Sequence, residues 1–93
     1  MRVYNERITG VETDRIGRPL RWTWRRRVYR AGPVLDYWVT TRDWWREEVS
    51  LADGGSQPIR HWLVEASSAA GSGQAELALD EASMTWRLIG LVD

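Results

Sequence analysis

The stretch that decides the fold covers residues 18–45 and reads R-P-L-R-W-T-W-R-R-R-V-Y-R-A-G-P-V-L-D-Y-W-V-T-T-R-D-W-W. It holds five of the seven tryptophans and seven of the thirteen arginines of the 93-residue chain. Much of it alternates between aromatic or apolar and polar residues, which is the period of a β-strand with one buried face. We therefore expect a β-hairpin followed by a third strand, with indoles on one face and arginines on the other.

A turn over Arg25 and Arg26 would pair Trp22 with Tyr29. One face of the hairpin is then predicted to collect Leu20, Trp22, Trp24, Tyr29 and Ala31, and the other Arg21, Thr23, Arg25, Val28 and Arg30. Two-residue hairpin turns prefer Gly or Asn because both central residues need a positive φ. Arg-Arg is poor there, so a longer loop with a shifted register is the alternative.

The rest of the chain reads as further short strands. We expect strands over residues 2–13, 34–40, 59–67, 75–80 and 84–92, with a bulge at Gly10 and a break at Gly32-Pro33. A helix over residues 75–89 is the main competitor, but its apolar spacing suits period two better than 3.6. Six or seven short strands predict an all-β fold: a small single-domain antiparallel barrel or sandwich over residues 1–93.

Composition argues against most site chemistry. The chain has no cysteine and one histidine, His61, so neither a disulfide nor a structural zinc site is expected. The residue types of a catalytic triad are present as Ser67, His61 and Asp36. No nucleophile-elbow pattern accompanies them, so we do not expect a triad. We predict a non-enzymatic protein with no metal and no cofactor.

The charges are unevenly spread although they sum to zero. Residues 1–30 carry a balance of +6 and residues 31–93 a balance of −6. The hairpin arginines therefore either form a free basic face for phosphates or pair with acids of the second half, such as Asp36, Glu65, Glu76 and Asp80. The candidate residues for binding nucleic acid or a partner are Arg21, Arg25, Arg26, Arg27, Arg30, Trp44, Trp45, Arg46 and Arg60.

Trp44-Trp45-Arg46 has two interpretations. Tryptophan and arginine dominate the energetics of protein–protein interfaces, so the segment is a candidate contact surface. Alternatively, one indole belongs to the core and the other packs under the acidic loop that follows, since a chain of this size needs large side chains to build a core.

The order of motifs resembles a family of small bacterial proteins of unknown function, and also the C-terminal module of the ImuB-like proteins, inactive relatives of translesion polymerases. The matching segments are residues 2–6, 18–30, 34–39, 44–46, 60–64 and 86–93. The sequence departs from the family pattern at Arg26, where the family usually has Gly, and in the Ala/Gly/Ser segment at 66–75. The resemblance implies an all-β accessory module beside DNA-damage-tolerance proteins, and no catalytic residue.

We therefore expect an interaction module serving damage-tolerance or translesion proteins. The alternative is single-stranded nucleic-acid binding through the arginine hairpin. An edge strand offers a route to a homodimer. The opening residues are polar and the longest apolar run, residues 88–92, is short, so neither a signal peptide nor a membrane contact is expected and a cytoplasmic protein is predicted.

Overall fold

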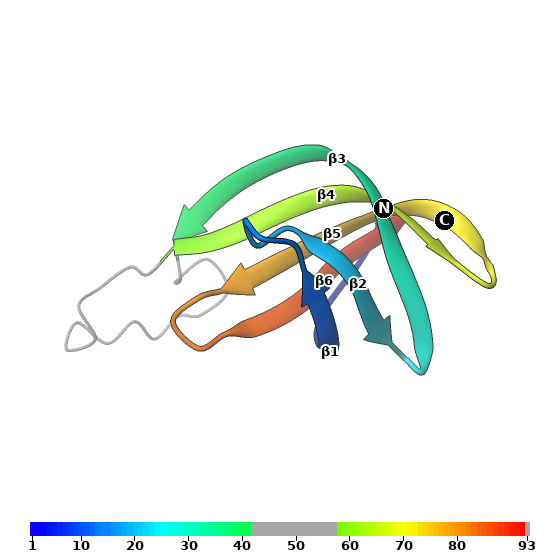
Figure 1. Ribbon diagram of the computed structural model, residues 1–93, viewed down its shortest axis with the longest axis horizontal. Helices are drawn as coiled ribbons and strands as arrows, with labels where there is room; N and C mark the ends of the chain where they lie inside the picture. Colours follow the sequence, from blue (N-terminus) through cyan, green and yellow to red (C-terminus); the bar gives the residue numbers. More distant parts are fainter. Residues whose placement is uncertain (42–57, 93) are drawn as a thin grey trace.

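The computed structural model describes residues 1–41 and 58–92, which form six antiparallel strands closed into a barrel (Figure 1). The strands are β1 (Arg2–Thr13), β2 (Pro19–Trp24), β3 (Arg27–Thr41), β4 (Pro58–Ser68), β5 (Gly71–Asp80) and β6 (Thr85–Val92). Each pairs with its neighbours in sequence, and β1 closes the barrel by pairing with both β2 and β6. The predicted all-β class is confirmed, and residues 75–89 form two strands rather than a helix.

The β2–β3 hairpin has the predicted register. Trp22 lies opposite Tyr29 and Thr23 opposite Val28, so the connecting turn contains only Arg25 and Arg26. Their φ values are 50° and 66°, which place both residues in the left-handed region that a type I′ turn requires. The longer loop with a shifted register does not form.

Indole and phenol rings fill the barrel interior. Trp22 stacks on Tyr29 at 5.7 Å between ring centroids, and Trp62 stacks on Trp86 at 5.3 Å. The buried cluster around them comprises Ile8, Trp24, Val64, Ala66, Ala75, Leu77, Leu79 and Leu88. A six-stranded barrel of this size has an interior that side chains fill, so the lumen is a core rather than a channel.

A smaller apolar cluster of Ile59, Ala78 and Ile89 lies on the other face of β4, β5 and β6. His61 shares that face because it lies opposite Ala78 in the β4–β5 ladder. Part of the outward face of these strands is therefore buried as well.

The pairing of β1 with β2 contains two irregularities. Gly10 adopts a φ of 63° where the register shifts between Thr9 and Glu12, which confirms the predicted bulge. On the β2 side Leu20 is the extra residue between Pro19 and Arg21. The predicted inward position of Leu20 is therefore wrong: the side chain is 47% exposed, and Pro19 is buried instead.

The predicted strand break at Gly32-Pro33 is also wrong. β3 continues through both residues, while its register against β4 shifts between Ala31 and Val34 and again between Val34 and Asp36. A bulge leaves its extra residues outside the ladder, so Pro33 needs no N–H there. The result is one long, strongly curved strand that arches over the barrel in Figure 1.

The connections divide the barrel into two ends. The β2–β3 and β4–β5 turns lie at one end, and the β1–β2 loop and the β5–β6 turn lie at the other (Figure 1). Within the described part of the chain, no helix is long and apolar enough to cross a membrane.

Candidate functional site

A pocket of about 460 Å³ opens at the end of the barrel that carries the β2–β3 turn. We call it the mouth pocket. Its lining has an aromatic part, an arginine part and a part made of small residues. The lining residues are Tyr4, Trp24, Arg25, Arg27, Tyr29, Ala66, Ser68, Ala70, Gly71, Ser72, Gly73, Leu91 and Val92.

The β4–β5 hairpin supplies the small-residue wall. Its strands pair from Ile59 opposite Asp80 to Ser68 opposite Gly71, so most of the Ala/Gly/Ser segment at 66–75 belongs to the β4–β5 ladder. Side chains no larger than serine on this wall leave open the space that the aromatic residues face. The volume of the pocket falls within the range typical of small-molecule sites.

Arg25 is tightly paired at the rim of the pocket. Its Nη2 lies 2.6 Å from Glu6 Oε2, and its Nε donates to Glu6 Oε1 at 3.3 Å. The Trp24 indole N–H donates to the same Oε1 at 2.9 Å. Hydrogen bonds from Arg25, and then from Trp24, lower the pKa of the Glu6 carboxyl below its ordinary value. Glu6 is therefore charged at neutral pH and fixes the orientation of both side chains.

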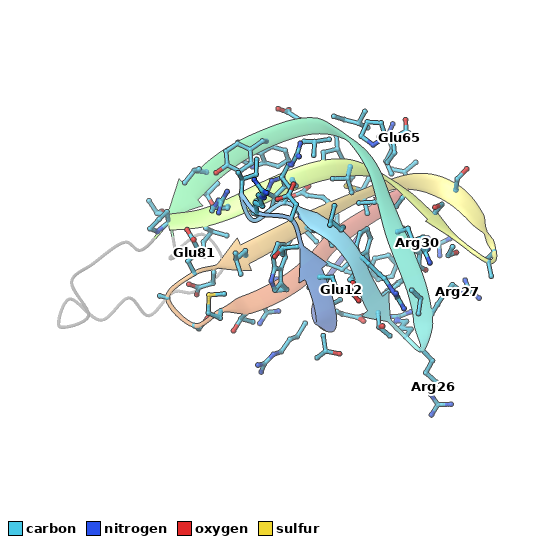
Figure 2. All side chains as sticks on the ribbon, viewed as in Figure 1. Glu12, Arg26, Arg27, Arg30, Glu65 and Glu81 are labelled. Carbon is cyan, nitrogen blue, oxygen red and sulfur yellow. The ribbon has the colours of Figure 1, made fainter. Side chains whose placement is uncertain are left out.

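Arg26, Arg27 and Arg30 have no carboxylate within 4 Å among residues 1–41 and 58–92. Figure 2 shows Arg26 projecting from the turn away from the barrel, and Arg27 and Arg30 on the adjoining arm of β3, with Glu81 at the opposite end of the molecule. Arg27 lines the mouth pocket, whereas Arg30, three residues farther along β3, points to the other face of the strand. We call these three residues the free arginines.

Arg30 also lies directly opposite Arg21 in the β2–β3 ladder. Like charges facing each other across an antiparallel pair are destabilising. The one carboxylate within 4 Å of this pair in the described structure is Glu12 of β1, whose Oε2 is 3.8 Å from Arg21 Nη1, a long contact between exposed groups. Positive charge is thus concentrated here at some expense to stability, as is often seen where an anion binds.

Some hairpin arginines are thus paired with carboxylates and others are not, so each of the two alternatives predicted from the sequence applies to part of the group. Arg21 and Arg25 are paired, but with Glu12 and Glu6 of β1 rather than with acids of the second half. The reason is topological: β1 pairs with β2 in the barrel, whereas Glu65, Glu76 and Asp80 lie on β4 and β5, which do not pair with β2. Arg26, Arg27 and Arg30 are the part of the predicted basic face that has no carboxylate partner among the described residues.

Arg60, also a predicted site residue, does not join this group. Its guanidinium lies over the rings of Trp62 and Tyr37, at 4.7 and 5.6 Å from their centroids. Its Nε donates to the Tyr37 hydroxyl oxygen at 3.0 Å, and its Nη2 donates to the Ile16 carbonyl at 3.3 Å. Arg60 holds the β1–β2 loop against the sheet, at the end of the barrel away from the mouth pocket.

Trp44, Trp45 and Arg46 lie outside the described residues. Conversely, the sequence did not single out Tyr4, Glu6 or the small-residue wall as parts of a site. Only the opening segment shared with the resembling family pointed to Tyr4 and Glu6, and nothing local in the sequence places them beside Trp24.

The structure does not bring Ser67 and His61 together, as a catalytic triad would require. Ser67 lies six residues from His61 along the same strand, which is roughly 20 Å. His61 instead stacks on Trp38 at 5.2 Å, and its Nε2 is 2.7 Å from Thr40 Oγ1. No group of three or more His, Cys, Asp or Glu that could hold a metal occurs among the residues that the structure describes.

Comparison with known proteins gives a family but no characterised relative. Neither a curated protein sequence nor a solved structure matches the chain significantly. The predicted membership of a small family of unknown function is confirmed, while the link to ImuB-like modules stays a prediction. Residues 1–93 match one family throughout, and the chain belongs to that family, described as "Domain of unknown function (DUF6504)".

Proposed function

We propose that this protein is a non-catalytic binding module that holds single-stranded nucleic acid at the mouth of the barrel. The observation that carries the proposal is the grouping of the free arginines beside an open pocket with aromatic walls. Arginine contacts phosphates, and aromatic side chains stack on bases without sequence preference. Small barrels bind single strands with this combination of groups.

The charge distribution supports attraction of nucleic acid by one part of the surface rather than by the net charge of the protein. The chain has no net charge, so nonspecific attraction to a polyanion is weak and must come from the free arginines. Three phosphate contacts to a single strand give a logarithmic salt slope of roughly −2. We expect moderate affinity at low salt that falls away within the physiological range.

The test is fluorescence anisotropy with a labelled oligothymidylate over a potassium chloride series. Arg27→Ala and Arg30→Ala should each weaken binding and flatten the salt slope by about 0.7. Arg15→Ala is the matched control, because it removes one exposed arginine from the β1–β2 loop at the opposite end of the barrel. The absence of any binding at low salt, or an equal effect of Arg15→Ala, would overturn the proposal.

A second proposal concerns a protein partner. Leu35, Tyr37 and Val39 of β3 are 44%, 44% and 53% exposed, an unusual run of apolar surface on one strand. We propose that a cytoplasmic replication or repair protein docks there, in the damage-tolerance setting that the resemblance to ImuB-like modules implies. A charge in the middle of such a contact, as in Val39→Glu, should abolish it.

Pull-downs from cells with damaged DNA test this second proposal. Val39→Glu should lose a replication or repair protein that the wild type and Val3→Glu retain, since Val3 is an exposed valine on β1. Recovery of no such protein would refute it. The predicted edge-strand homodimer is the competing occupant, because β3 beyond Ala31 pairs only with β4 in the described structure. Sedimentation at high micromolar concentration distinguishes a self-pairing chain from a monomer.

A further inference from the structure

Arg25 differs from the free arginines in a way that assigns it another task. It is the first residue of the β2–β3 turn, and two contacts to Glu6 fix its guanidinium at 2.6 and 3.3 Å. Its charge is therefore already neutralised by a carboxylate. A phosphate gains little from approaching Arg25, because Glu6 repels the same anion.

The guanidinium plane of Arg25 is nevertheless presented to solvent. Its central carbon lies 4.5 Å from the Trp24 ring centroid and 5.1 Å from that of Tyr4, so it rests on an aromatic floor. Tyr4 itself packs edge-on against Trp24 at 4.7 Å. The Arg25 side chain remains 58% exposed, so it covers the indole without being covered in turn. Bases of single-stranded nucleic acid stack on guanidinium planes as they do on aromatic rings.

Arg27 complements this arrangement. It lies opposite Trp24 in the β2–β3 ladder, lines the same pocket, and has no carboxylate partner in the described part of the chain. A guanidinium has only donors, so a ligand between Arg25 and Arg27 must offer acceptors as well as a planar ring. A nucleotide unit supplies a base and an adjoining phosphate.

We propose that the mouth pocket receives one unstacked base of the bound strand, with Arg25 as its stacking platform and Arg27 as the partner of the adjoining phosphate. This inference rests on the proposed function and deepens it. Glu6 is then the residue that positions the platform, by holding the Arg25 guanidinium over Trp24. The small-residue wall of Ser68 and Ser72 provides the room that the base needs.

The two arginines have separable signatures in binding measurements. Removing Arg27 should lower the salt slope by about 0.7, because one phosphate contact is lost. Removing Arg25 should lower affinity roughly 5- to 150-fold, the range for one stacked base, and leave the slope unchanged, because its charge is already paired. Glu6→Gln should steepen the slope, since it releases the charge of Arg25.

The experiment compares a labelled oligothymidylate with an abasic oligomer of equal length and charge, over a potassium chloride series. The wild type should prefer the base-bearing strand, and Arg25→Ala should abolish that preference. Arg25→Lys keeps the charge and the ion pair but removes the plane, so it should behave like Arg25→Ala. Ser72→Phe, which fills the pocket from its exposed wall, should also abolish the preference, whereas Arg15→Ala should retain it. Circular dichroism confirms that each variant is folded.

The outcomes separate this inference from the function on which it rests. If the wild type binds both oligomers equally, with a salt slope that Arg27→Ala reduces, the base pocket is refuted and nucleic-acid binding stands. If Arg25→Ala and Arg27→Ala reduce the slope equally, the division of roles is refuted. If neither oligomer binds, both proposals fall. Displacement of the oligomer by an acidic peptide whose affinity depends on Arg25 would assign the pocket to a protein ligand instead.

Discussion

Arg26 is one of four non-glycine residues with a positive φ in the described part of the chain. Its φ of 66° costs a residue with a Cβ roughly 1–2 kcal/mol. Arg26→Gly should remove that cost, offset in part by the greater freedom of glycine in the unfolded chain, and raise the free energy of unfolding by about 0.5–1 kcal/mol. The same variant should weaken oligonucleotide binding. Urea unfolding and anisotropy measure the two effects.

Arg26→Asn is the control for this gain in stability and loss of binding, because asparagine tolerates the left-handed region and also lacks the charge. It should follow Arg26→Gly in both measurements. Arg27→Asn, at an extended position of β3 opposite Trp24, should weaken binding with no gain in stability. A stable Arg26→Gly variant with undiminished binding would mean that the unfavourable turn residue has no part in holding the strand.

Glu6 gives a pH dependence whose sign is fixed. Its pKa is lower in the folded state, through hydrogen bonds from Arg25 and Trp24, than in the unfolded chain. The unfolded state therefore takes up a proton first as the pH falls. The stabilisation from Glu6 is fully present above the ordinary glutamate pKa and is lost as the pH falls through the lowered folded value.

Thermal unfolding of the wild type and Glu6→Gln between neutral and acidic pH measures this contribution. The difference between the two melting temperatures should be largest near neutrality and shrink in the acidic range. Glu12→Gln is the matched control, since its contact with Arg21 is 3.8 Å and exposed and should matter little. A difference that is constant across the pH range would show that the Glu6 carboxylate does not stabilise the fold through its charge.

At the scale of elements, β1 pairs with two different strands, and its bulge permits the change of partner. Its first half pairs with β6 and its second half with β2, and the change of partner falls between Ile8 and Thr9, next to Gly10. Gly10→Ala should destabilise the protein by about 1–2 kcal/mol, because alanine at a φ of 63° is unfavourable. An added Cβ would find its nearest neighbour, Thr23 Oγ1, at 3.6 Å, so the cost is conformational rather than steric.

Thr9→Ala at the adjacent exposed position is the control and should change the free energy of unfolding by less than about 0.5 kcal/mol. Denaturant unfolding measures both variants. A Gly10→Ala variant as stable as Thr9→Ala would indicate that β1 turns toward its second partner without needing a left-handed residue.

Alternation along the chain predicts most strands and the hairpin register, because period-two patterning depends only on which side is buried. Bulges are where it fails. Leu20 points outward because an extra residue reverses the alternation, and Gly32-Pro33 bends a strand that its composition suggested would end. Residues such as Gly and Pro are typical of both turns and bulges. Which of the two forms depends on the pairing with the neighbouring strand.

Alternation likewise predicts only part of the candidate site. The parity of the hairpin places Arg27 and Tyr29 on one face and Arg30 on the other, and this can be read from the sequence. Which arginines find carboxylates depends on β1 lying beside β2, a contact between segments far apart in the chain. Tyr4 reaches Trp24 only because the barrel closes, so no local pattern could reveal the mouth pocket.

For the whole molecule, the two ends of the barrel separate binding from stability. The free arginines lie at the end of the barrel that carries the mouth pocket, and Arg27 lines it. Arg60 at the other end contacts Tyr37, Trp62 and the β1–β2 loop with only 24% of its side chain exposed. Arg60→Met keeps the apolar stem but loses the cation–π contacts and hydrogen bonds. We expect a loss of about 1–3 kcal/mol in the free energy of unfolding, with oligonucleotide affinity and salt slope unchanged.

Arg27→Met is the matched variant at the mouth and should show the opposite behaviour. Its guanidinium has no partner in the described structure to lose, so stability should change by less than about 0.5 kcal/mol. Binding should weaken and the salt slope should flatten. Both variants remove one positive charge from a chain with no net charge, so any long-range electrostatic effect is common to the two. If Arg60→Met reduced the slope as much as Arg27→Met does, the bound strand would have to extend along the whole barrel, and the mouth pocket would be only one part of its path.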